Sequence, residues 1–345
     1  MTAPKTVAVF GATGSQGGAV VRSLLDNQSK CFAVRAITRD PQSQKSKDLA
    51  ALGAEVVRAD GWNVAEMAAA LEGCWAAFVN TNSDDPIFAN KESPTEFDLG
   101  KSIIDSLVAA NVRHIVYSSF ASAAELTRGK LFIRPMDLKN QILQYAKSTA
   151  HFDSVCPIYA AWYYEQFLDK ATATVFGGFP YTLDSDGYMT FNAPRWGDDE
   201  KPSFVSITRD FGDLVHGILL SPESWNGKPV AAASDVQTFE QLVETFQTAT
   251  GHPSRYIPMA SWKDFGRGIP ELDEHRLLFA FTQLTGGRYF GDVPTSTETA
   301  AALKRVGAEA RGKDGAEASL LPLGKWFAEK FGVGSGASAC VDGGH

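Results

Sequence analysis

Apolar and polar positions alternate with two different periods along the first 155 residues. Short runs rich in β-branched and aromatic residues are typical of strands, whereas longer segments with apolar residues three or four positions apart are typical of helices. The short runs predict strands at 6–10, 33–38, 55–59, 76–80 and 114–118. The longer segments predict helices at 16–28, 44–52, 64–73 and 96–111. Strands separated by helical crossovers indicate an α/β fold with a doubly wound parallel sheet.

The pattern becomes less regular after residue 152. An aromatic-rich stretch is followed by 177–204, whose glycines, prolines and aspartates indicate hairpins and loops over the strand ends. Further helices are predicted at 210–220, 239–250, 295–306 and 325–331. We therefore expect a first domain of residues 1–155, a smaller C-terminal α+β substrate lobe of residues 156–331 packed closely against it, and a flexible tail of residues 332–345.

The composition argues against some classes of binding partner. The 345 residues carry 32 Lys and Arg against 40 Asp and Glu, a net charge of −8, which argues against direct binding of nucleic acid or of an anionic membrane. No apolar run approaches the roughly 18 residues of a membrane span, and the first predicted strand leaves no room for a signal peptide. These features predict a cytoplasmic protein, with the nucleus as a second compartment.

Neither the cysteines nor the histidines form a metal-binding pattern. The four cysteines are widely spaced and include no C-x-x-C, so buried, reduced thiols are expected. No two of the six histidines stand four residues apart. We predict no metal site and no disulfide framework.

Glycines at positions 11, 14 and 17 form the pattern G-x-x-G-x-x-G between the first strand and the first helix. In a dinucleotide site, Gly11 permits the tight turn, Gly14 lets the backbone approach a pyrophosphate, and Gly17 lets the helix pack on the strand. Thr13, Ser15 and Gln16 would add hydrogen bonds to the same site. No Lys-Ser or Lys-Thr follows, which excludes a P-loop. The alternative is a tight strand-to-helix turn without a ligand, but its position favours a Rossmann domain that binds a dinucleotide.

The end of the second predicted strand indicates which dinucleotide. NAD sites usually place a carboxylate there for the ribose hydroxyls, whereas an arginine suits a 2′-phosphate. Arg39 stands at this position, after Thr38 and before Asp40. Asp40 would oppose a phosphate if it faced the site, but Asp-Pro is also a common start of a turn. We expect NADP(H) in preference to NAD(H).

Several segments together resemble the NmrA-like family of atypical short-chain dehydrogenase/reductases. They are GATGSQGG, TRDP, AFVNTN, DLGKSIIDSLVAANVRHIVYSS, MDLKNQILQY, WYYEQF, FVSITRDFGDLVHGIL and SDVQTFEQLVETFQTATG. The resemblance spans about residues 5–265. It implies an NADP(H) lying over the sheet, with its nicotinamide near Lys139 and near an aromatic segment that contains Trp162 and Tyr163. The family's histidine and asparagine in these two segments are Pro135 and Gln166 here.

Three further positions complete the predicted cofactor site. They are Asn80 and Thr81, after the fourth strand, and Tyr159. Five aromatic residues gather in this part of the chain, namely Tyr159, Trp162, Tyr163, Tyr164 and Phe167. They are interpreted either as core or as a flat apolar wall on which a ring-bearing substrate stacks.

The usual proton relay of the wider superfamily is missing from the sequence. In Y-x-x-x-K, the lysine lowers the pKa of a tyrosine that protonates a carbonyl; none of the nine tyrosines here has a lysine four residues later. Lys139 is then a candidate to orient the nicotinamide ribose or to act as an acid, unless it is a solvated helix lysine. Ser119, with Ser118, ends the fifth strand, where a hydroxyl would contact substrate or nicotinamide or only cap the strand.

Two functions are compatible with these residues. The first is an NADP(H)-dependent enzyme that acts on a small aromatic or cyclic molecule, an enone or an imine. A C=N⁺ group already carries its positive charge, so iminium reduction tolerates the missing tyrosine better than ketone reduction does. A redox-neutral reaction in the same pocket is a further alternative. The second is a redox sensor, which the family resemblance implies directly: a non-catalytic NADP(H)-binding protein that regulates a transcription factor or signalling enzyme.

Overall fold

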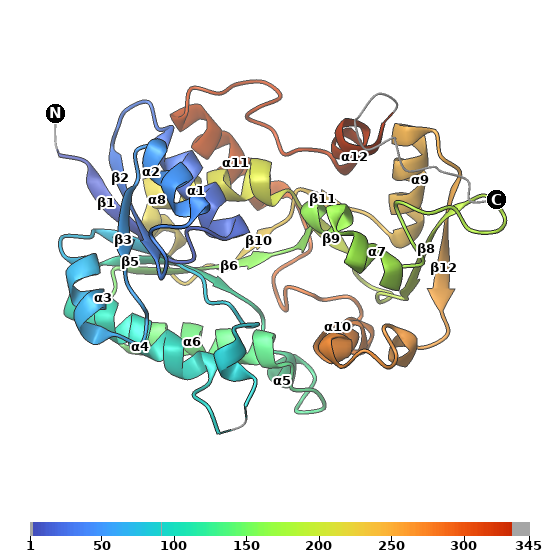
Figure 1. The fold of residues 1–345 in the computed structure, drawn as a ribbon, viewed down its shortest axis with the longest axis horizontal. Helices are drawn as coiled ribbons and strands as arrows, with labels where there is room; N and C mark the ends of the chain where they lie inside the picture. The colour runs from blue at the N-terminus through green and yellow to red at the C-terminus, as the bar shows by residue number, and fades with distance from the viewer. Residues whose placement is uncertain (1–2, 91, 333–345) are drawn as a thin grey trace.

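The computed structural model describes residues 3–90 and 92–332, and its centre is a seven-stranded sheet in which all neighbouring strands are parallel (Figure 1). The strand order is β10-β6-β5-β4-β1-β2-β3. The strands are β1 (Lys5–Val9), β2 (Phe32–Thr38), β3 (Glu55–Arg58), β4 (Ala76–Val79), β5 (His114–Ser119), β6 (Ser154–Ala160) and β10 (Val230–Ala232). The order reverses between β1 and β4, and in such sheets ligands bind at the carboxyl ends of the strands beside this reversal.

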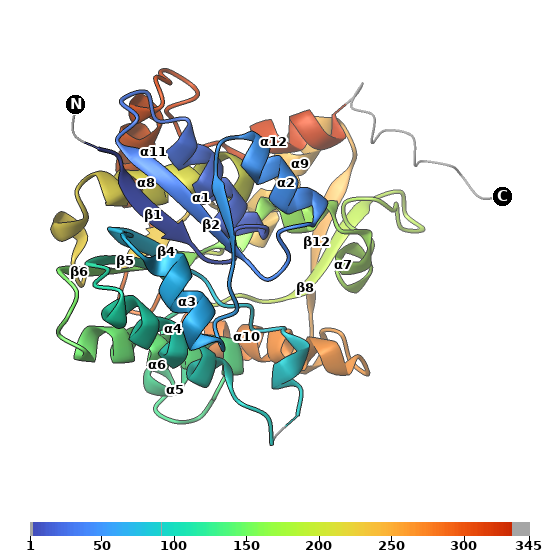
Figure 2. The same ribbon diagram turned by 60° about the vertical axis from the view of Figure 1, so that its left-hand side comes forward.

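Helices cover both faces of the sheet, as a parallel sheet requires. Figure 2 shows three of them on one face: α1 (Ser15–Leu25), α8 (Gly212–Leu220) and α11 (Glu298–Ala310). On the other face lie α3 (Val64–Leu71), α4 (Glu96–Ala109) and α6 (Arg134–Ser148). Each face has its own buried apolar core. A short helix, α2 (Gln44–Ala51), follows β2. The doubly wound α/β fold predicted from the sequence is confirmed.

The sheet includes more of the chain than the first 155 residues. All five predicted strands are present, but β6 and β10 were not predicted, and β6 runs across the boundary expected at residue 155. Two helices from later in the sequence, α8 and α11, pack on each other, and α8 packs on α1. The layers around the sheet therefore contain segments from beyond residue 155.

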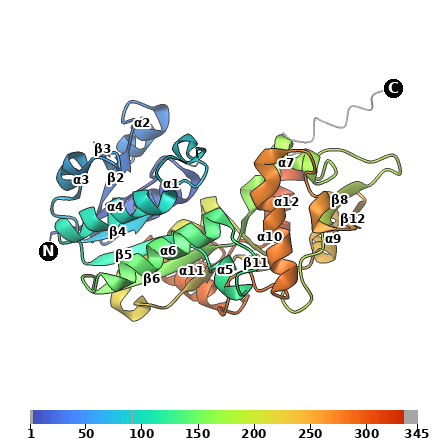
Figure 3. The same ribbon diagram turned by 90° about the horizontal axis from the view of Figure 1, so that it is seen from below.

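A second lobe holds two small sheets, β11-β9-β7 and β12-β8, at the right of Figure 1. Its strands are β7 (Trp162–Tyr163), β8 (Met189–Pro194), β9 (Ser203–Val205), β11 (Asp235–Val236) and β12 (Ser254–Met259). Its helices are α7 (Lys170–Val175), α9 (Phe239–Thr250), α10 (Asp273–Leu284) and α12 (Leu323–Phe331). In Figure 3, α10 faces the sheet domain near α5 (Ala123–Leu126).

The predicted helices of this half correspond to α8, α9, α11 and α12, whereas α10 was not predicted. A short π-helical turn, Ile207–Phe211, precedes α8. Within the described residues, no helix is both long and apolar enough to cross a membrane. From residue 333 onward, the tail expected to be flexible lies outside the described residues.

Candidate functional site

The glycine turn joins β1 to α1 at the carboxyl edge of the sheet. Gly11 has a φ of +63°, and its carbonyl oxygen accepts a hydrogen bond from the amide of Gly14 at 2.9 Å. A Cβ on Gly17 would lie 2.2 Å from that same carbonyl oxygen, so only glycine fits there. A Cβ on Gly11 would lie 3.5 Å from the carbonyl oxygen of Asn80, which places the end of β4 beside the turn. The turn thus has the compactness expected of a dinucleotide loop.

The N-terminus of α1 is open. Its N-cap residue, Gly14, has no side chain to cap the helix, and Ser15 and Gly14 are exposed while Thr13 is half-buried. Gln16 is buried; its Nε2 donates a hydrogen bond to the hydroxyl of Tyr163 at 2.6 Å, and its Oε1 has no hydrogen-bond partner among the described residues. Free amides at a helix start attract a phosphate, and an orphaned amide oxygen can accept a ligand donor. These residues fit a dinucleotide.

Arg39 follows β2 at the same edge. Its side chain is 65% exposed, and its Nη1 lies 2.7 Å from Oδ2 of Asp85 in the loop after β4. Asp40 uses its Oδ1 to accept a hydrogen bond from the amide of Gln42 at 2.9 Å. Of the two interpretations of Asp40, the structure therefore favours the start of a turn.

Lys139 is buried rather than solvated, with 7% of its side chain exposed. Its Nζ donates hydrogen bonds to the carbonyl oxygen of Thr81 at 2.6 Å and to Oγ1 of Thr81 at 2.8 Å, and it forms an ion pair with Oε1 of Glu96 at 2.7 Å. Burial lowers the pKa of Lys139, while the charge of Glu96 opposes that shift. The ammonium is held by its carboxylate partner at the carboxyl end of β4.

Glu96 was not recognised from the sequence. It is the first residue of α4, it is fully buried, and its Oε1 also accepts a hydrogen bond from Oγ1 of Thr81 at 2.5 Å. Its other oxygen, Oε2, and the hydroxyl of the neighbouring Tyr117 are both buried without a hydrogen-bond partner among the described residues. In the sequence, Glu96 is only an acid in the first turn of a predicted helix. Such acids are common and do not indicate a buried ion pair.

Ser119 contacts the backbone that carries Lys139. Its hydroxyl donates to the carbonyl oxygen of Lys139 at 3.2 Å, so it joins the end of β5 to α6. Tyr159, directly opposite Ser119 in β6, is buried, and burial raises its pKa to about 12. As the structure stands, the hydroxyl of Ser119 binds the protein's own backbone.

The aromatic residues divide between core and site. The ring of Trp162 lies within 6.5 Å of six phenylalanine rings, those of Phe167, Phe176, Phe191, Phe204, Phe239 and Phe279. Tyr164 is buried and donates to the carbonyl oxygen of Leu321 at 2.9 Å. Tyr163 instead reaches the glycine turn through Gln16. Much of the expected aromatic wall is therefore the core of the second lobe.

Two acids, Asp137 and Glu165, lie in segments that resemble the NmrA-like family, and both hold loops near the site. Asp137 accepts hydrogen bonds from Oγ of Ser122 and from the amides of Ala124 and Ile133, and so fixes the segment that precedes α6. Glu165 accepts from the amides of Ile207 and Thr208 at the π-helical turn. Their side chains therefore fix the backbone of the segment before α6 and of the π-helical turn.

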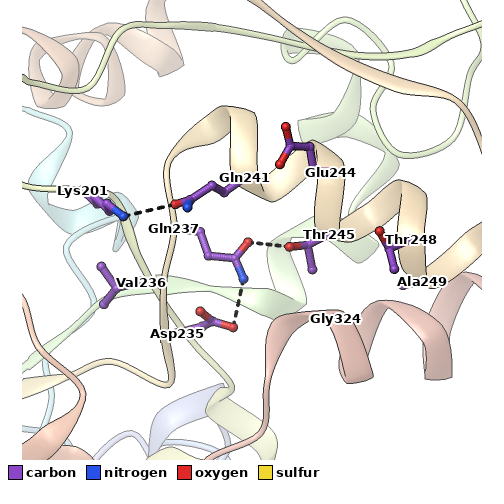
Figure 4. Close-up of a pocket in the computed structure, with 10 residues that line it drawn as sticks. All are labelled: Lys201, Asp235, Val236, Gln237, Gln241, Glu244, Thr245, Thr248, Ala249 and Gly324. Atoms are coloured by element: carbon purple, nitrogen blue, oxygen red, sulfur yellow. Dashed lines mark hydrogen bonds between the residues drawn. The ribbon is translucent and has the colours of Figure 1, made fainter.

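A groove of about 610 Å³ lies elsewhere, on the second lobe (Figure 4). It runs between α9, β11 and the start of α12, and no residue of the predicted cofactor site lines it. Its polar side chains bind one another: Lys201 donates to Gln241, and Gln237 donates to Asp235. Across the described part of the chain, no group of three His, Cys, Asp or Glu side chains is placed to hold a metal ion.

Comparison with known proteins identifies the family. The profile described as the NmrA-like family matches residues 3–304. The chain belongs to the NmrA-like family. This NmrA-like protein is 67% identical over 328 residues to the NmrA-like family domain-containing oxidoreductase lnbB of Aspergillus flavus, with 95% of this chain and 98% of the relative covered.

Solved structures show the same fold at lower identity. NmrA, a negative transcriptional regulator solved in complex with NADP, is 20% identical with a TM-score of 0.70, and the match covers 96% of each chain. The NADPH-dependent quinone oxidoreductase QOR2 of Escherichia coli, solved with NADPH, is 20% identical with a TM-score of 0.64, covering 94% of this chain and 99% of the other. The NmrA-like protein therefore shares its fold with two proteins that were solved with NADP or NADPH bound.

Proposed function

We propose that this NmrA-like protein is an NADP(H)-dependent oxidoreductase that acts on a small cyclic or aromatic molecule, an enone or an imine. The observation that carries the proposal is the buried Lys139–Glu96 pair at the carboxyl edge of the sheet. A buried ion pair costs desolvation energy that an apolar pair would not, so its place beside a ligand crevice favours a role in function. The naming of a 67% identical relative as an oxidoreductase supports the same proposal.

Different residues of the chain would bind different parts of the cofactor. The glycine turn and the free amides of α1 would hold the pyrophosphate, and Arg39 would hold the 2′-phosphate. Gln16 and Tyr163 would contact the half of the cofactor beyond the pyrophosphate. Lys139 would fix the nicotinamide ribose by hydrogen bonds from its ammonium. When bound, the cofactor supplies or accepts a hydride at its nicotinamide ring.

The substrate class follows from what the site can do with protons. Lys139 and Glu96 together carry no net charge, so they repel a cationic substrate little. Tyr159 and Tyr163 have pKa values raised by burial, which makes both hydroxyls poor proton donors. A substrate whose reacting group needs no proton from a tyrosine, such as an iminium, fits these groups best.

Substitution of Lys139 by methionine tests the proposal. NADPH oxidation is measured against a panel of cyclic imines, enones and quinones, and NADPH affinity is measured by titration. In the variant we expect turnover to fall by about 100-fold or more, while affinity falls by less than about tenfold, or 1.4 kcal/mol. Lys147→Met, at an exposed position near the end of the same helix, is the matched control and should leave both quantities unchanged.

The second candidate function is a redox sensor, which the likeness in fold to the regulator NmrA favours. A sensor binds NADP(H) but turns nothing over, so Lys139→Met would lower affinity and leave no rate to lose. Tight NADPH binding combined with no oxidation of any compound in the panel would favour the sensor. Equal turnover by parent and variant would contradict the role proposed for Lys139.

A further inference from the structure

The contact between Arg39 and Asp85 lies at the carboxyl edge of the sheet, where the dinucleotide is proposed to bind. In the sheet, β1 lies between β2 and β4. Arg39 directly follows β2, and Asp85 lies in the loop that follows β4. An ion pair between them at 2.7 Å must therefore bridge the carboxyl end of β1, where the glycine turn begins.

The two carboxylate oxygens of Asp85 have different tasks. Oδ1 accepts a hydrogen bond from the amide of Ile87 at 3.2 Å and so caps the short helix Pro86–Phe88. Oδ2 binds Arg39. The capped helix fixes the position of the carboxylate, which is largely buried, whereas most of the Arg39 side chain is exposed and can exchange partners.

We propose that Asp85 is a specificity-determining residue that competes with the 2′-phosphate of NADP(H) for Arg39. The inference rests on the NADP(H) site proposed above. A phosphate monoester and a carboxylate are both anions that bind a guanidinium through its N–H donors, and Asp85 already occupies Nη1, so the two anions compete for Arg39. NADP(H) must displace Asp85 and then lie near its negative charge, whereas NAD(H) brings no second anion to Arg39. Asp85 thus reduces the preference for NADP(H) that Arg39 creates.

Asp85→Asn separates the two tasks of this side chain. The amide oxygen of asparagine can still cap Pro86–Phe88, but the charge that holds Arg39 is gone. Calorimetric titration of the purified protein with NADPH and with NADH measures both affinities. We expect the variant to bind NADPH about threefold to fivefold more tightly, as an exposed ion pair would allow, and NADH within about twofold of the parent.

Three further proteins complete the test. Glu92→Gln removes an exposed carboxylate further along the same loop and should change neither affinity. Arg39→Ala should weaken NADPH binding and leave NADH binding nearly unchanged. In the Arg39→Ala background, Asp85→Asn should lose most of its effect on NADPH, because the two residues act as a pair.

The Arg39 and Asp85 variants test different claims: Arg39→Ala tests the NADP(H) site, and Asp85→Asn tests the competition for Arg39. If Arg39→Ala leaves the NADPH-to-NADH ratio unchanged, the proposed 2′-phosphate site is wrong and the inference falls with it. If Arg39→Ala lowers the ratio but Asp85→Asn does not raise it, only the competition is wrong. An equal gain for both cofactors also overturns the competition, since it would mean that Asp85 merely obstructs the crevice.

Discussion

A buried lysine keeps its proton only if nearby groups stabilise the ammonium, and few such groups face Lys139. Its Nζ is faced by Glu96 from α4 and by Thr81 from the end of β4, and the charge of Asp84 acts on it from the following loop. Burial is the largest influence and lowers its pKa; Glu96 is the largest influence in the opposite direction. Loss of Glu96 would therefore leave burial largely unopposed.

Glu96→Gln is expected to move the loss of the Lys139 proton to lower pH. The ammonium exists below the pKa of Lys139, so any property that needs it is lost as pH rises through that pKa. In the variant, turnover and NADPH affinity should decline at a lower pH than in the parent, with the ammonium fraction falling roughly tenfold per pH unit beyond the pKa. Titrations and rates across neutral to alkaline pH measure this.

Glu92→Gln is the control for that experiment, since it removes an exposed acid near the start of the same helix. Its pH profile should match that of the parent. Superimposable profiles for Glu96→Gln and the parent would show that Glu96 does not hold the charge of Lys139.

At the scale of elements, α1 is fixed at both ends. Its N-terminus follows the glycine turn, and its C-terminal half packs on α8 through buried polar contacts. His216 of α8 lies 3.1 Å from Oγ of Ser23 through Nδ1, and its Nε2 accepts a hydrogen bond from Nδ2 of Asn27 at 2.8 Å. A proton on Nε2 would face the amide donor of Asn27, so this arrangement suits the neutral imidazole.

Burial lowers the pKa of His216 to about 4, below the ordinary value of 6.5. The unfolded chain then binds a proton that the folded protein excludes, so the free energy of unfolding should fall as pH falls from about 6.5 to about 4. The full shift corresponds to about 3 kcal/mol. Denaturant unfolding at a series of pH values measures the slope.

His216→Gln should flatten that slope, although the variant starts from lower stability at neutral pH. His275→Gln, at an exposed position, should keep the slope of the parent. A parent slope that survives in His216→Gln would assign the acid sensitivity to other groups.

The elements differed in how far the sequence could predict them. The five strands of the first half were predicted because polar or glycine-containing turns bound each apolar run. Strand β6 was not, because the aromatic run continues past its end, so no change of period marks where the strand stops. Lys139 and the glycine turn could be placed from motifs. Glu96 and Asp85 could not, because their partners lie on other elements and only the fold brings them together.

At the scale of the whole molecule, the chain passes repeatedly between the two lobes. After β6 it enters the second lobe, returns for α8 and β10, leaves again for α9 and α10, and returns once more for α11 (Figure 1). The sheet is complete only when these late segments are in place.

A chain of residues 1–155 should therefore fail to fold as an independent domain. It would lack nearly all of β6 and the whole of β10, expose the edge of β5, and leave the apolar side of α1 without α8. Circular dichroism and thermal unfolding of this fragment should show no cooperative transition, in contrast to residues 1–332. A cooperative transition in the shorter chain would support the boundary expected at residue 155.

One side chain joins the loop after β4 to the second lobe. Arg134 donates to the carbonyl oxygen of Ser83 at 3.1 Å and forms an ion pair with Glu274 of α10 at 2.7 Å. Ser83 belongs to the same loop as Asp85. Substitutions in α10 that break this ion pair are therefore expected to loosen the loop that carries Asp85 and, under the role proposed for Asp85, to alter cofactor preference.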